Sequence, residues 1–199
     1  MNSTDRMQYQ IRLANILVKA GKNKRYYHSL QVAQMAEDMA KRFGLDADKA
    51  YLSGLLHDIA RSLPTNQLFY LAGLAQIPIK EIYWGNPALM HAPVGAYLLQ
   101  RDFGIEDQEI LASVRNHTLG APQMSGLDKI IYLADMLEPG RKWQGIEVLR
   151  ELADRDLDIA MKEALLQSID WLKEKGKRLD SQTLEAYEYF CKLVAKKDI

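Results

Sequence analysis

The chain has 199 residues, 48% of them hydrophobic, and its 26 lysines and arginines balance its 26 aspartates and glutamates. A chain of this length buries the core of one domain or of a tightly packed pair. Zero net charge argues against a general attraction to nucleic acid or to an anionic membrane, because such partners leave a basic bias. We therefore expect neither partner.

The N-terminal residues, the least charged stretch and the cysteine content bear on the cellular location of the protein. Residues 1–10 lack the apolar core of a signal peptide, and the least charged stretch, residues 85–100, is too short to cross a bilayer. The single cysteine, Cys191, excludes an internal disulfide and a cysteine-rich zinc site. We expect a cytoplasmic protein in which the Cys191 thiol is buried.

The apolar residues recur at steps of three and four almost throughout the chain, which is typical of helices. Glycines and prolines at the ends of these segments divide the sequence into about eight to ten helices. No alternating β-branched run predicts a strand. The sequence predicts an all-α fold forming one domain over residues 1–199, with a core over about 9–145 and C-terminal helices over about 146–199 packed on it.

The first two helices of interest each carry a histidine. His28 stands at the start of a periodic segment, and residues 50–64, AYLSGLLHDIARSLP, form an apolar helix with His57 and Asp58 near its end. At 100° per residue, His57, Asp58 and Arg61 lie on the side of that helix away from its leucines. A solvated polar face is the ordinary explanation of such a group.

Three residues further along the chain stand in apolar surroundings. His91 lies within NPALMHAPVGAYLL, His117 ends EILASVRNHTLG, and Asp135 lies within KIIYLADMLEP. A carboxylate in such a segment is costly to bury unless it is paired or bound to a metal. For each histidine taken alone, a core imidazole bonded to a backbone carbonyl is the alternative.

The order of these residues, each on its own helix, resembles the ligand series of the two-metal HD-domain phosphohydrolases. The series consists of His28, His57, Asp58, His91, His117 and Asp135. The stretches LLHDIAR, HAPVGAYLL and RNHTLGAPQMSGLDKIIYLADMLEPGR are similar to the YqeK-like family of bacterial symmetrical diadenosine tetraphosphate hydrolases. The resemblance runs from about residue 9 to at least residue 160.

The resemblance implies an HD-domain helical bundle with a dinuclear metal site in its core. Asp58 is expected to bridge two divalent ions, with His28, His57 and Asp135 completing one site and the pair His91 and His117 the other. Iron is the expected metal, and manganese, zinc, nickel or cobalt would suit the same ligands. The implied reaction is attack of a metal-bridging hydroxide on a dinucleoside tetraphosphate, releasing two nucleoside diphosphates.

A polyphosphate substrate also needs cations, for which guanidinium groups are well shaped. We expect Arg61, Lys129 and Arg141 to bind the substrate, and Asp58, Arg61 and Glu138 to be catalytic. Glu138 would orient a metal-bound water or ligand, or cap the turn at the following proline. The neighbours of His117, Asn116 and Thr118, are candidate hydrogen-bond donors to the site.

Other functions stay open at this point. A two-metal site would also serve hydrolysis of nucleoside mono- or diphosphates, and the metals could instead support a nucleotide-binding module without turnover. Hydrolysis of guanosine polyphosphates is disfavoured, because the related enzymes usually follow the His-Asp pair with two acidic residues, whereas Ile59, Ala60 and Arg61 follow it here. The apolar and aromatic residues of the C-terminal helices would suit a homodimer contact.

Overall fold

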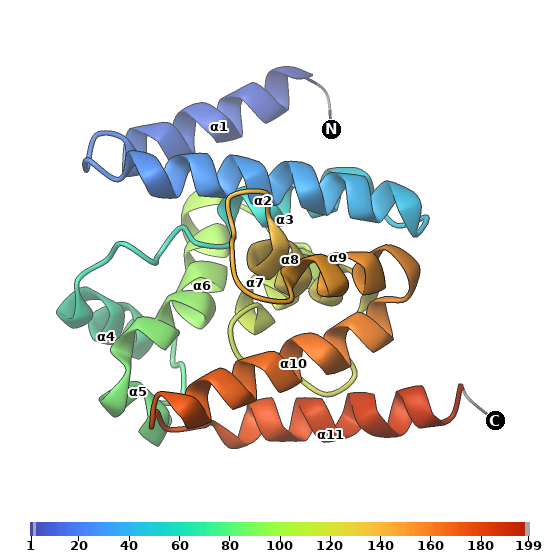
Figure 1. Ribbon diagram of the computed structural model, residues 1–199. Coiled ribbons are helices and arrows are strands. Elements are labelled where there is room, and N and C mark those ends of the chain that lie inside the picture. The colour runs from blue at the N-terminus through green and yellow to red at the C-terminus, as the bar shows by residue number, and fades with distance from the viewer. Residues whose placement is uncertain (2, 198–199) are drawn as a thin grey trace.

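The computed structural model describes residues 1 and 3–197. Every regular element within them is a helix, which confirms the all-α class (Figure 1). The described residues form eleven α-helices and one 3₁₀ helix, more than the eight to ten predicted. Their bounds are α1 (Ser3–Leu17), α2 (Asn23–Arg42), α3 (Ala47–Leu56), α4 (Thr65–Leu74), α5 (Glu81–Gly85), η1 (Pro87–Met90), α6 (His91–Phe103), α7 (Gln108–Asn116), α8 (Gly126–Leu137), α9 (Ile146–Arg155), α10 (Leu157–Glu174) and α11 (Ser181–Ala195).

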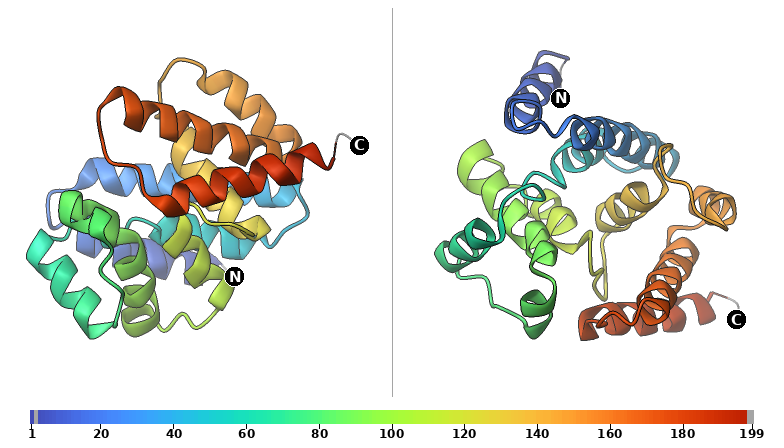
Figure 2. Two further views of the ribbon diagram at one scale, coloured as in Figure 1. Left: turned by 90° about the horizontal axis from the view of Figure 1, so that it is seen from below. Right: turned by 60° about the vertical axis from the view of Figure 1, so that its left-hand side comes forward.

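The helices surround α8. Figure 1 shows α1 and α2 along one side of the molecule and α10 and α11 along the opposite side, and the views in Figure 2 place α8 between them. Helices α2, α3, α7, α9 and α10 all contact α8, and α11 lies against α10. The predicted division into a core over 9–145 and a packed C-terminal segment stays a prediction, and residues 198 and 199 of that segment lie outside the described residues.

Helix α8 is central because its sequence is apolar around almost its whole circumference. Its start is fixed by a capping box, in which Ser125 and Asp128 each accept a hydrogen bond from the other's backbone N–H. Asp135 is the exception near its C-terminal end, where the side chain is partly exposed to a cavity described below. Across the part of the chain that the structure describes, no helix is both long and apolar enough to span a membrane.

Helices α2 and α3 pack most extensively of all, and a glycine sets their separation. A Cβ atom on Gly54 would lie 2.9 Å from the Ala33 Cα atom and 3.0 Å from its backbone nitrogen. This approach covers the polar side of α3, so His57 and Asp58 are 0% and 6% exposed. A solvated polar face, the ordinary explanation of such a group, is therefore excluded. The helix predicted over residues 50–64 was wrong in its extent, because α3 ends at Leu56.

Cys191 also differs from expectation. It is a free thiol on α11, and it is half-buried rather than buried. The reason is the position of α11 on the outside of the molecule, where it lies against α10 (Figure 1).

Candidate metal centre

The six predicted ligands converge from five helices or their ends. His28 belongs to α2 and Asp135 to α8, whereas His57 and His117 directly follow the last residues of α3 and α7, and His91 begins α6. Their ligand atoms form three overlapping groups, each spanning less than 4.8 Å, which could hold metal ions. The groups are His28, His57 and Asp58; His57, His117 and Asp135; and Asp58, His91 and His117.

Three of the histidines are oriented by the same backbone interaction. In each, the Nδ1 atom lies at hydrogen-bond distance from the carbonyl oxygen three residues earlier, 2.7 Å both for His57 with Gly54 and for His117 with Val114. His91 makes the equivalent contact. Because a carbonyl accepts hydrogen bonds only, Nδ1 carries the proton and Nε2 presents its lone pair to the cluster. This is the tautomer that a metal ligand requires.

The two oxygens of the Asp58 carboxylate face different ligands. Its Oδ1 atom lies 3.0 Å from Nε2 of His91 and 3.8 Å from Nε2 of His117. Its Oδ2 atom lies 3.9 Å from Nε2 of His57. A carboxylate in this position could serve two ions at once, one through each oxygen.

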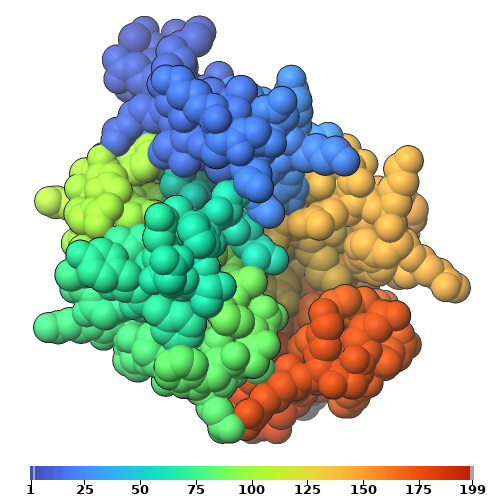
Figure 3. Space-filling view, turned by 90° about the vertical axis from the view of Figure 1, so that its left-hand side faces the viewer, coloured from blue at the N-terminus to red at the C-terminus, as the bar shows by residue number. Residues whose placement is uncertain are grey.

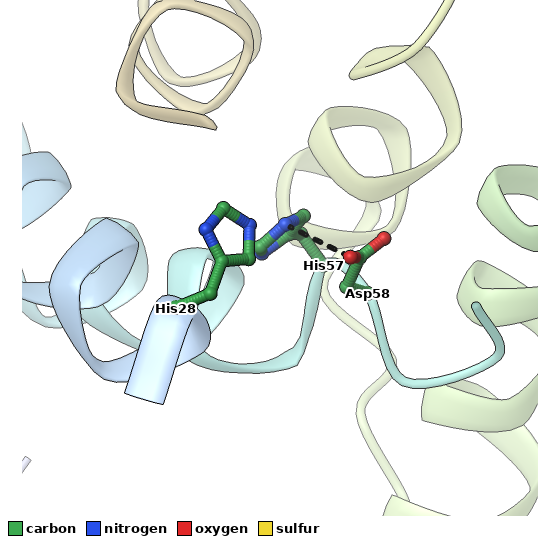
Figure 4. Close-up of side chains that lie close together, drawn as sticks. All are labelled: His28, His57 and Asp58. Atoms are coloured by element: carbon green, nitrogen blue, oxygen red, sulfur yellow. Dashed lines mark ion pairs between the residues drawn. The ribbon is translucent and has the colours of Figure 1, made fainter. Parts of the chain in front are cut away.

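The remaining ligands gather on the Oδ2 side. Figure 4 shows His28 and His57 beside Asp58, with the ion pair between His57 and Asp58 dashed. Nε2 of His28 lies 3.1 Å from Oδ1 of Asp135, and Nε2 of His57 lies 3.8 Å from the same oxygen. Asp135 therefore completes the group that contains the two histidines.

Burial and charge set the protonation of the cluster. Burial lowers the pKa of His57 to about 4, so this ring is neutral at pH 7. Burial opposes ionisation of Asp58, but the surrounding imidazoles outweigh it and hold the pKa of this carboxyl well below its usual range. Burial likewise acts to lower the pKa of His117, yet the Asp58 carboxylate outweighs it and raises that pKa. The cluster thus attracts positive charge.

The donor set fits divalent cations. Nε2 of His28 and Nε2 of His57 are buried and make no hydrogen bond of good geometry with a described residue, although the His28 nitrogen lies 3.1 Å from Asp135 Oδ1. Nε2 of His91 and Nε2 of His117 lie 3.0 Å apart, and with both Nδ1 atoms protonated the two lone pairs face each other. Imidazole nitrogens and carboxylate oxygens are ligands for iron, manganese, zinc and nickel. A bound cation would satisfy the orphaned nitrogens and relieve this repulsion.

Glu138 contacts His28 on the edge of its ring that faces away from Asp135. It is 4% exposed, and its Oε1 atom lies 3.2 Å from Nδ1 of His28, so that Nε2 of this ring points toward Asp135. Its Oε2 atom accepts a hydrogen bond from the backbone N–H of Gly140, which caps the turn after α8. Glu138 therefore orients a candidate ligand and caps the turn.

We expect Glu138→Ala to weaken metal binding by about 10- to 100-fold, the usual cost of losing a group that orients a metal-binding histidine. Competition with a coloured chelator measures this affinity. Glu109→Ala is the matched control, because the Glu109 side chain is 43% exposed, pairs with Lys49 and lines neither of the two cavities described below. Equal affinity in both variants would show that Glu138 does not position His28.

The cluster lies in a cavity of about 920 Å³, here called the metal cavity. Besides five of the ligands, its lining includes three arginines, Arg25, Arg61 and Arg141. Arg25 contacts Asp58 at 2.7 Å and Arg141 contacts Asp135 at 2.7 Å. The side chain of Arg61 makes no hydrogen bond or ion pair with any other described residue. Three guanidinium groups therefore surround the candidate metal ligands, and that of Arg61 has no partner among the described residues.

Two predicted contacts lie elsewhere. Lys129 does not line the metal cavity, and its ammonium is 2.6 Å from a carboxylate oxygen of Asp158 on α10. Its contact with a substrate stays a prediction, which this ion pair does not support. Asn116 donates a hydrogen bond to Asp128 at 3.1 Å in the connection between α7 and α8, whereas Thr118 lines the metal cavity.

Arg25 was missed by the sequence analysis although a signal was present. It stands three residues before His28 on the same helix, a spacing that places both side chains on one face. An arginine one turn from a candidate metal ligand is positioned to contact an anion that reaches the cluster.

Comparisons with known proteins identify the family of this chain. The chain belongs to the HD domain family, since residues 25–140 match its family model. Within that family it is YqeK-like. It is 36% identical over 165 residues to a protein of Bacillus subtilis (strain 168) named symmetrical bis(5'-nucleosyl)-tetraphosphatase, covering 83% of this chain and 88% of the relative. A Halalkalibacterium halodurans protein of the same name is 38% identical over 163 residues, 82% of this chain and 87% of its own length.

A solved structure supports the same assignment. The crystal structure of a Clostridium acetobutylicum protein described as a predicted HD superfamily hydrolase involved in NAD metabolism matches with a TM-score of 0.88 and 35% sequence identity. The match covers 96% of this chain and 98% of that one. The all-α HD-domain fold implied by the sequence is thereby confirmed.

Proposed function

We propose that this protein is a symmetrical dinucleoside tetraphosphate hydrolase that uses two divalent ions, iron in the first place. The observation that carries the proposal is the Asp58 carboxylate, whose two oxygens face separate groups of histidines in a cavity with three arginines. Diadenosine tetraphosphate is the proposed substrate, because relatives at 36% and 38% identity are named for this class of reaction. The symmetry of cleavage rests on those names.

The candidate ligands divide into two sets around Asp58. His28, His57 and Asp135 would hold one ion with Asp58, and His91 and His117 would hold the other. Two such ions would lower the pKa of a shared water and neutralise phosphate charge during in-line displacement. The oxygen of water bonds to one central phosphorus, the central bridging oxygen leaves on the other half, and two nucleoside diphosphates result.

The arginines have separate parts in binding. Arg61 is free to form paired hydrogen bonds with phosphate oxygens. Arg25 and Arg141 contact the carboxylates of Asp58 and Asp135, and from there they would reach phosphates placed beside those groups. The leaving group is a phosphate that carries its negative charge without a proton, so these three cations stabilise it as the bond breaks.

Substrate preference distinguishes the proposal from hydrolysis of simpler nucleotides. The metal-loaded protein should have a kcat/KM for diadenosine tetraphosphate at least about tenfold above the values for adenosine mono- and diphosphate, a difference of about 1.4 kcal/mol in transition-state binding. Ion-exchange chromatography of timed reactions gives these values. A higher kcat/KM for either simple nucleotide would contradict the proposal.

A further inference from the structure

A second cavity of about 1100 Å³ adjoins the metal cavity. It lies between the α5–η1 segment and the C-terminal end of α10, on the face shown in Figure 3, where these segments border a hollow. The two cavities share part of their lining, so they lie side by side. The shared residues include Arg61, Thr118, Trp143 and Trp171.

The lining of the second cavity differs in chemistry from that of the metal cavity. It includes the amide side chains of Asn86, Gln144 and Gln167, which can bond to the polar edge of a base. Apart from Arg61, it includes three carboxylates, Asp170, Glu174 and Asp180, and two cations, Lys177 and Arg178, so it carries no excess of positive charge to attract phosphate. This cavity therefore suits a neutral, hydrogen-bonding group better than another phosphate.

An aromatic ring stands where the cavities meet. Trp171 is 48% exposed, and Nζ of Lys177 lies 4.4 Å from the centre of its ring. A large aromatic side chain half in solvent beside a polyphosphate site is suited to stacking against a nucleobase. Trp143 also lines both cavities, and it is partly buried against the core.

The chemistry of the proposed substrate requires two nucleoside subsites. Cleavage of the central phosphate bridge leaves a nucleoside at the far end of each pair of phosphates. One pair and its nucleoside must therefore extend beyond the reacting phosphorus in each direction. Arg61 lines both cavities and has no other partner among the described side chains, so it can hold the phosphates that extend toward the second cavity.

We propose that the second cavity is the subsite for one of the two nucleosides, with its base stacked on Trp171. This inference rests on the proposed function. It assigns Trp171 to substrate specificity: the side chain contacts the base and leaves the metal ligands untouched. It also explains why a tryptophan is left half-exposed at the junction.

Trp171→Ala tests the assignment in the metal-loaded protein. Loss of one base–aromatic stack should lower kcat/KM for diadenosine tetraphosphate by about 5- to 100-fold. Inorganic tetraphosphate has the same four phosphates and no nucleoside, so its inhibition constant should not change. Trp171→Phe keeps a flat ring and should restore most of the loss. An unchanged kcat/KM, or an equal weakening of inorganic tetraphosphate, would overturn the inference.

Trp84→Ala is the matched control. Trp84 is 68% exposed, stacks on Phe69 and lines neither cavity. Its removal should therefore leave unchanged both kcat/KM for diadenosine tetraphosphate and the inhibition constant of inorganic tetraphosphate. A loss in this variant equal to that of Trp171→Ala would show that removing any exposed tryptophan produces the effect, and would also overturn the inference.

A binding measurement separates this inference from the proposed function. Absence of diadenosine tetraphosphate hydrolysis by the unaltered protein would count against the proposed function alone. Calorimetric titration with adenosine diphosphate then tests the cavity without turnover. Metal-loaded protein should bind about two equivalents, one per nucleoside subsite, and Trp171→Ala about one. The same stoichiometry in both proteins would contradict the inference.

Discussion

Asp58→Ala should lose metal binding and hydrolysis together while keeping its helical fold. Both carboxylate oxygens face candidate ligands, so its removal takes one ligand from each proposed ion. Electrostatic stabilisation by bound metal is worth several kcal/mol, so kcat/KM should fall by about a thousandfold or more. Metal content by mass spectrometry and turnover, measured on the same sample, check the expectation.

The fold should survive because Arg25, the ion-pair partner of Asp58, has a side chain 31% exposed and can reach water once the carboxylate is gone. Circular dichroism should therefore match the unaltered protein. Asp38→Ala is the matched control, since Asp38 is exposed and bonds to Gln34 on the outer face of α2. Full activity in Asp58→Ala would rule out the bridging role.

Gly54→Ala should destabilise the protein, although alanine is the better helix former. A Cβ at this position meets the backbone of Ala33, which cannot rotate away, and overpacking of this kind costs about 1–3 kcal/mol. The gain in helix propensity is at most about 1 kcal/mol. With the full gain subtracted, a net loss of up to about 2 kcal/mol remains, and it should lower Tm by about 2–4 °C for each kcal/mol in a chain of this size.

The same substitution at Gly73 is the control. Gly73 lies inside α4, and a Cβ there would have no atom within 4 Å, so Gly73→Ala should raise Tm by a few degrees. Gly54→Ala should also weaken metal binding, because the Gly54 carbonyl orients His57. A Tm for Gly54→Ala at or above that of the unaltered protein would contradict the close contact of α2 with α3.

The convergence of the six candidate ligands could be predicted from the sequence because the chain has only four histidines and they stand in a characteristic order. The burial of His57 and Asp58 could not. An angular projection of α3 shows which residues share a side, but only the fold reveals that α2 covers the polar side where Gly54 permits it. The end of α3 at Leu56 also escaped prediction, since no glycine or proline marks it.

Lys129 and Arg25 also show that a position in the sequence does not by itself reveal which side chains reach the site. Lys129 lies six residues before Asp135, and at about 100° per residue the two side chains point about 120° apart on α8. Lys129 accordingly reaches Asp158 rather than the metal cavity. Arg25, three residues before His28, lies only about 60° from it and reaches Asp58. The helical spacing of both residues can be read from the sequence. Applied to the predicted substrate contacts, it favours Arg25 over Lys129.

The most direct test of the central claim is the identity of the products formed from diadenosine tetraphosphate in ¹⁸O-labelled water by the metal-loaded protein. We predict adenosine diphosphate alone, half of the molecules carrying one ¹⁸O atom, because water attacks one central phosphorus and the bridging oxygen leaves with the other half. Mass spectrometry of the separated nucleotides gives both results. Adenosine mono- and triphosphate as products, or no turnover with two metal ions bound, would contradict the claim.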